Sequence, residues 1–166
     1  MAKPLTFVVL LLVAAVAAAL FGALHNQLSY SVGPTYFTAL KFPQFGISES
    51  MSPRLGAALV GIQASWWMGV IVGLPAFLYG LIAVPNARTI LAAGLGAVFL
   101  VFLLATFGAL AGLLAGLAAD NTGLIDSYIT FPEGPTRSDL LLAGFMHDAS
   151  YIAGAIGALA AFFPMR

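Results

Sequence analysis

The chain has 166 residues, of which 61% are hydrophobic and 7% charged, and its formal net charge is zero. About a quarter of the residues of a soluble domain are charged, so this composition predicts an integral membrane protein. The expected surroundings are therefore the lipid bilayer. The absence of cysteine excludes disulfides and thiolate metal ligands. No basic cluster occurs, so nucleic acid is not an expected partner.

Four apolar stretches are long enough to cross a bilayer as helices. We expect them at about residues 4–24, 56–84, 90–118 and 139–163. The first follows Lys3 and, at about 20 residues, is longer than the apolar core of a typical signal peptide, so we expect it to be retained as an anchor. The predicted fold class is an all-α integral membrane protein. It has a single transmembrane domain over residues 1–166, an antiparallel four-helix transmembrane bundle.

Two long segments, residues 25–55 and 119–138, connect these spans. The first is too long for a turn and too rich in aromatic residues for a disordered linker. Aromatic rings with a polar edge are favoured at the level of the lipid headgroups. We therefore predict that the two long loops form an extracytoplasmic cap, in which short helices and a small β-hairpin are both compatible with the first loop. Pro75 predicts a kink in the second span, because it removes a helical hydrogen bond.

The distribution of basic residues gives a predicted orientation. Four spans place both termini on one side, together with the short turn that contains Arg88. Lys3, Arg88 and Arg166 would then lie on that side without any acidic residue. Basic residues close to spans favour the cytoplasm. We therefore predict a multi-pass protein of the plasma (inner) membrane with both termini cytoplasmic.

Small residues recur at four-residue spacing in three of the spans. Such stripes let helix backbones approach each other closely. We favour packing within the chain, with contacts to a second copy or to other membrane subunits as the alternative. The stripes are Gly61, Ser65, Gly69 and Gly73; Gly108, Gly112 and Gly116; and Ala149, Ala153 and Gly157.

The polar side chains of the spans gather in the half of the predicted bundle next to the long loops. His147 and Asp148 interrupt an otherwise apolar helix, where ionisable groups are costly and mark functional sites. At about 1.5 Å of rise per residue, the second span places its polar residues at a similar depth. The predicted ligand or proton site consists of His25, Gln63, Trp66, His147, Asp148 and Tyr151.

Three interpretations of this polar layer remain open. It could be structural, with Asp148 paired to Arg54 or to a histidine. It could bind a small molecule, such as a quinone headgroup, or relay protons. It could also hold a transition metal on His25, His147 and Asp148, or a haem between the two histidines.

No catalytic motif occurs, so an enzyme is not favoured. The preferred function is a small membrane protein acting as a binding or accessory subunit. The alternatives are a metal- or haem-binding redox protein that uses His25 and His147, and a transporter of a small solute or protons. A transporter needs a polar path to the cytoplasm, and the sequence of the inner half is nearly devoid of polar residues.

Overall fold

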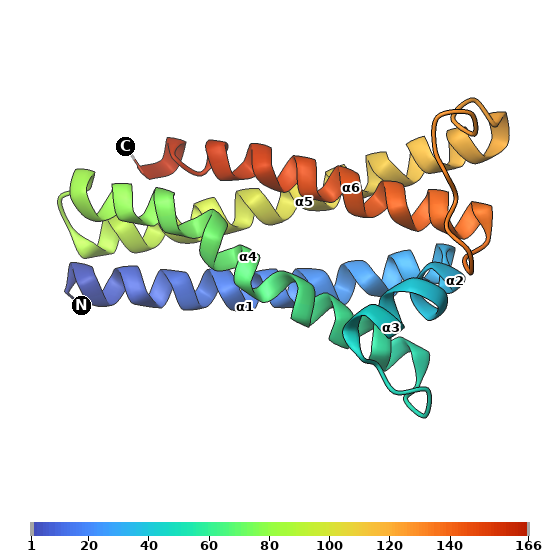
Figure 1. The fold of residues 1–166 in the computed structure, drawn as a ribbon. Helices are drawn as coiled ribbons and strands as arrows, with labels where there is room; N and C mark the ends of the chain where they lie inside the picture. Colours follow the sequence, from blue (N-terminus) through green and yellow to red (C-terminus); the bar gives the residue numbers. More distant parts are fainter. Residues whose placement is uncertain (1, 166) are drawn as a thin grey trace.

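A computed structural model describes residues 2–165 and is helical throughout its regular elements (Figure 1). Its four long helices are α1 (Lys3–Val32), α4 (Pro53–Ala83), α5 (Ala87–Thr122) and α6 (Arg137–Ala160). Each of them is long and apolar enough to cross a membrane, which suggests a multi-pass membrane protein. The shorter elements are α2 (Pro34–Tyr36), the π-helix η1 (Phe37–Lys41), α3 (Phe42–Phe45) and the 3-10 helix η2 (Phe163–Met165).

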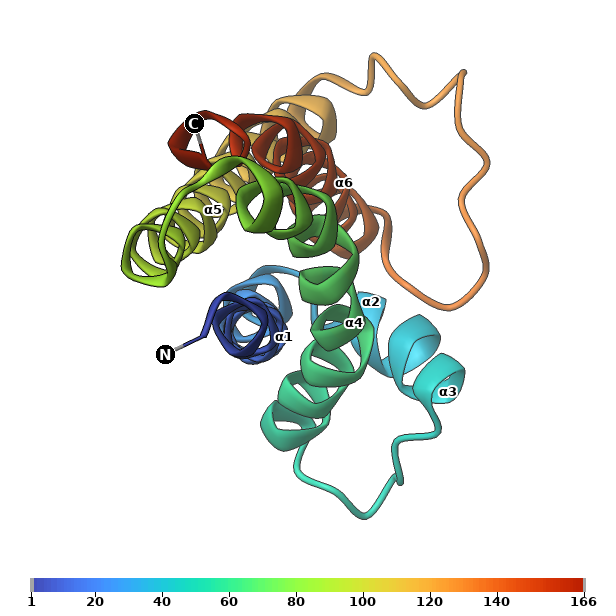
Figure 2. The ribbon, with the colours of Figure 1, turned by 90° about the vertical axis from the view of Figure 1, so that its left-hand side faces the viewer.

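The long helices pack as two antiparallel pairs, α1 with α4 and α5 with α6 (Figures 1 and 2). The ends of the chain lie at the same end of the bundle as the turn between α4 and α5. The two long connections lie at the opposite end. The prediction of four membrane-length helices that alternate in direction is therefore confirmed.

Glycines set the close approach within each pair. A side chain on Gly61 of α4 would collide with the backbone of Gly22 in α1. A side chain on Gly108 of α5 would come within 2.5 Å of Ala153 Cβ in α6. The small-residue stripes of α4, α5 and α6 are therefore used for packing within the chain, as favoured from the sequence.

The helix α1 continues eight residues past the predicted end of the first span, up to Val32. The sequence here is polar, and several of its side chains donate to backbone carbonyls without unwinding the helix. The Asn26 side chain donates to the carbonyl of Ala57 (3.0 Å), and Ser29 Oγ donates to the carbonyl of His25 (3.2 Å). The first half of the predicted loop 25–55 is therefore largely helical, and no strand occurs among the described residues.

The other helix boundaries follow local capping chemistry. The side chain of Asn86 accepts a hydrogen bond from the Thr89 amide at the start of α5 (2.9 Å). Gly123 ends α5 with φ +65°, a conformation that glycine adopts at little cost. Helix α5 thus takes up the first residues of the predicted loop 119–138. Helix α4 runs through Pro75 without interruption and changes direction partway along its length (Figure 1).

The two long connections meet each other and the start of α6 at their end of the bundle, where the Thr136 amide donates to Thr35 Oγ1 (2.8 Å). Asp139 Oδ2 accepts hydrogen bonds from the Thr35 amide (2.6 Å) and from Thr35 Oγ1 (2.7 Å). Arg137 forms ion pairs with Asp120 and Asp126 and donates to the last carbonyls of α5. These contacts fix the start of α6 relative to both α2 and the end of α5.

Candidate functional site

The two histidines of the chain meet inside the bundle. His25 lies in α1 and His147 in α6, which belong to different helix pairs. Their ring centroids are 4.6 Å apart and the ring planes are nearly perpendicular, at 84°. The residues are 6% and 8% exposed, so both imidazoles are removed from the lipid and from solvent.

The positions of the two histidines follow from helix periodicity. On α1, Gly22, His25, Asn26 and Ser29 recur at a spacing that places them on one face, and all four are buried. On α6, Met146, His147 and Ser150 form the corresponding buried face. His147 Nε2 lies 3.4 Å from Ser29 Oγ across the interface of the two helices.

Aromatic rings surround the histidine pair. Phe21 stacks on His25 at 5.5 Å between centroids. Tyr36 and Phe37, from the segment between α1 and α4, lie 5.4 and 6.0 Å from the His147 ring. This shell holds the rings in place and lowers the local polarity, which strengthens any hydrogen bond made inside it.

One atom of this pair has no partner. His25 Nε2 is buried and makes no hydrogen bond with any described residue. Among the described residues, it is the one buried side-chain nitrogen or oxygen found without a hydrogen bond. A buried polar group without a partner costs about 1–3 kcal/mol, so such groups are rare and call for an explanation. A ligand atom is one such explanation.

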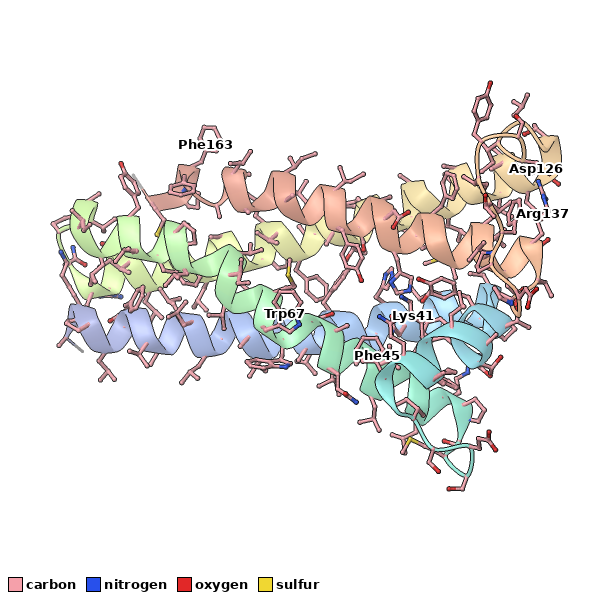
Figure 3. The ribbon with its side chains drawn as sticks, in the orientation of Figure 1. Lys41, Phe45, Trp67, Asp126, Arg137 and Phe163 are labelled. Carbon is pink, nitrogen blue, oxygen red and sulfur yellow. The ribbon has the colours of Figure 1, made fainter. Side chains whose placement is uncertain are left out.

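Beside the histidines lies a polar cavity of about 360 Å³. It is enclosed by α1, α4 and α6 together with η1 and α3, and its polar lining includes His25, Asn26, Lys41, Gln63, His147 and Tyr151. Figure 3 shows Lys41 and Phe45, both of which line it, on the short helical segments beside the bundle. The polar cavity thus receives groups from segments that are far apart in the sequence.

Lys41 is the cationic side chain of this lining. It is half-buried, and its ammonium donates to Gln44 Oε1 (3.2 Å) and lies 5.2 Å from the centre of the Tyr36 ring. Burial lowers the pKa of Lys41, and the negative charge of Asp148 acts in the opposite direction. The ion pairs found among the described residues are those of Arg137, so Lys41 has no carboxylate within ion-pair distance.

The structure brings together four of the six predicted site residues. His25, Gln63, His147 and Tyr151 line the polar cavity, while Trp66 and Asp148 do not. Asp148 is exposed, because it follows His147 directly and one residue turns an α-helix by about 100°. Trp66 is 52% exposed, and its neighbour Trp67 lines the cavity instead.

Two other expectations about this region differ from the structure. Arg54 does not pair with Asp148; it donates to the Gln27 carbonyl (2.8 Å) and to Ser31 Oγ (2.9 Å). The described residues contain no group of three His, Cys, Asp or Glu side chains that could hold a metal ion. The set of His25, His147 and Asp148 is therefore not assembled as metal ligands here, although its two histidines are adjacent.

A second, apolar cavity of about 490 Å³ adjoins the first. It lies among all four long helices, and Phe21, Ser65, Ser150 and Tyr151 line both cavities. Sequence reasoning missed it, as it missed Lys41. The apolar cavity depends on how the two helix pairs diverge, and Lys41 reaches the site only because the segment after α1 folds back.

Comparisons with protein-family models, with curated proteins and with solved structures found no match for this chain. The functional argument therefore depends on the geometry of the two cavities.

Proposed function

We propose that the protein is a membrane-embedded binding or accessory subunit whose ligand places a polar group in the polar cavity. The observation that carries this proposal is His25, a residue that lines that cavity and whose buried Nε2 has no hydrogen-bond partner among the described residues. A ligand atom in contact with it would remove the cost of the unmade hydrogen bond. Lys41 and Tyr151 would supply further donors to the same group.

The two halves of the bundle favour binding over transport. The half with the chain ends is apolar, and its buried cluster includes Leu10, Phe77, Ile90 and Met165. A polar solute or a proton would need hydrogen-bonding groups along this half. A binding site whose polar groups are confined to the other half agrees better with this arrangement than a polar path through the protein.

We further propose that the two long connections cap the extracytoplasmic end and that both termini are cytoplasmic, in the inner membrane. The hydrogen bond from the Thr136 amide to Thr35 Oγ1 (2.8 Å) supports such a cap, because it joins the two connections, and Asp139 of α6 accepts hydrogen bonds from the same threonine. A reporter enzyme that is active only in the cytoplasm, fused to the C-terminus, should be active. Activity of a periplasm-specific reporter at that position would overturn the orientation.

Native mass spectrometry of the protein purified in mild detergent tests the binding function. The wild-type protein should carry a non-covalent adduct, and His25→Gln should reduce its occupancy. Thr106→Val is the matched control, because Thr106 is a polar residue of a spanning helix that bonds only within α5 and lines neither cavity. Bare protein in every preparation, or equal occupancy in His25→Gln, would contradict the proposal.

The adjacency of the two imidazoles also supports a second function, metal binding for redox chemistry. The 4.6 Å between ring centroids favours a metal ion bound by both rings, and it is too short for a haem iron held between them. The adduct would then have the mass of a metal ion. Elemental analysis and the visible spectrum of the same sample would identify it, and neither metal nor a visible band would exclude this second function.

A further inference from the structure

We propose that the ligand is a fatty acid, with its carboxylate in the polar cavity and its hydrocarbon chain in the apolar cavity. This inference depends on the proposed binding function and gives the ligand a chemical class. It follows from three properties of the two cavities, which are their contact, their charge and their length.

The two cavities lie next to each other and share part of their lining, one side polar and the other apolar. Tyr151 belongs to both linings, and its ring lies 6.2 Å from that of His147. On the far side of Tyr151 the lining consists of alanine, valine, phenylalanine and other apolar residues. A ligand that fills both cavities must therefore be an amphiphile with one polar end.

Lys41 brings a positive charge to the polar cavity and favours an anionic end, while the negative charge of Asp148 acts on the same lysine without forming an ion pair. Lys41 is half-buried and has no carboxylate within ion-pair distance among the described residues, and His25 Nε2 has no hydrogen-bond partner there. A carboxylate would accept hydrogen bonds from both side chains. Hydrogen bonds with a charged partner are roughly twice as strong as neutral ones, so an acid should bind better than the alcohol of the same length.

The apolar cavity has the length of a single leaflet. Its lining on α6 extends from Ser150 to Leu159, which corresponds to about 14 Å along a helix. Half of the hydrocarbon core of a bilayer measures about 15 Å. Ile71 and Leu159 line the cavity and are exposed on the bundle surface, so a chain can enter from the lipid. The carboxylate would then lie toward the long connections and the methyl end toward the chain ends.

A photoactivatable palmitic acid with a diazirine near its methyl end provides the test. The wild-type protein in nanodiscs should cross-link it at residues of the apolar cavity, such as Val98 or Ala158, as located by peptide mass spectrometry. Unlabelled palmitic acid should compete with the probe, and hexadecanol should compete about tenfold less well. Labelling elsewhere, or equal competition by the two compounds, would overturn the proposal.

Two pairs of variants separate the carboxylate site from the hydrocarbon site. Lys41→Gln should weaken labelling about tenfold, whereas Lys3→Gln, at the opposite end of the bundle, should not. Gly154→Leu should block the apolar cavity, because Gly154 lines it and a side chain there meets open space. Gly144→Leu is its control on the same helix, since Gly144 also faces open space but lines neither cavity. Equal labelling within either pair would contradict the proposal.

The failure of this inference can be distinguished from the failure of the binding function. A native adduct whose mass is not that of a fatty acid would overturn the inference and leave the binding function intact. No adduct and no specific labelling would remove both.

Discussion

The imidazole rings of His25 and His147 lie nearly perpendicular to each other, 4.6 Å apart, at the place where one helix pair meets the other. Glycine contacts hold each pair together internally, but the contact between the pairs here is polar and aromatic. The site is therefore also a junction between two packing units. A ligand that bridges His25 and Lys41 would connect α1 to η1 beside this junction.

Close packing within the α5–α6 pair gives the first prediction. Gly112→Leu should destabilise the protein by about 1–3 kcal/mol or more, since the new side chain would collide with the Phe145 carbonyl and reach 2.8 Å from Ala149 Cβ. Gly96→Leu on the same helix is the control, because a side chain there meets open space and improves helix propensity. Thermal unfolding in detergent measures both variants. An equal melting temperature for the two would refute the packing account.

The link between α2 and the start of α6 gives the second prediction. Asp139→Ala removes the acceptor of two hydrogen bonds from Thr35 and should raise the exchange rate of the Thr35 amide about tenfold or more. Asp139→Asn keeps an oxygen acceptor without the charge and should give an intermediate rate. Hydrogen exchange with peptide mass spectrometry resolves this region. Glu133→Gln, an exposed acid in the second connection, should leave the rate unchanged.

The environment of Lys41 gives a prediction about pH. Burial lowers the pKa of its ammonium below the ordinary 10.5, so Lys41 should react with an acylating reagent at a lower pH than a free lysine side chain does. Because the folded state binds this proton less tightly than the unfolded chain, stability should increase as the pH rises from the folded pKa toward 10.5.

Asp148→Asn is the informative variant for this prediction. It removes a negative charge that raises the pKa of Lys41, so the reaction profile should shift to still lower pH. A profile centred at or above 10.5 in the wild type, or a shift toward higher pH in Asp148→Asn, would show that Lys41 is not in the buried position described.

Hydropathy predicted the four long helices because an apolar run of this length has few alternatives in a bilayer. It missed the continuation of α1 to Val32, since the partners of Asn26 and Ser29 come from tertiary structure and from the helix itself. The short helices after Gly33 were left open for the same reason. Their stability comes from contacts with α4 and α6 that a local pattern does not contain.

The candidate site was predicted in part. The depth of a residue along a helix follows from the number of residues to the end of the span, so His25, Gln63, His147 and Tyr151 were placed in the same half of the bundle, next to the long loops. The rotation of each helix depends on its neighbours, and this is why Asp148 and Trp66 were included although they lie outside the polar cavity. Lys41 was missed because it stands in a connection whose path was unknown.

A crystal structure of the protein purified in mild detergent without delipidation tests the central claim most directly. The account predicts non-protein density in the polar cavity within hydrogen-bond distance of His25 Nε2, extending past Tyr151 into the apolar cavity. A polar cavity filled by protein side chains or by ordered water alone, with His25 Nε2 bonded to a protein group, would contradict it.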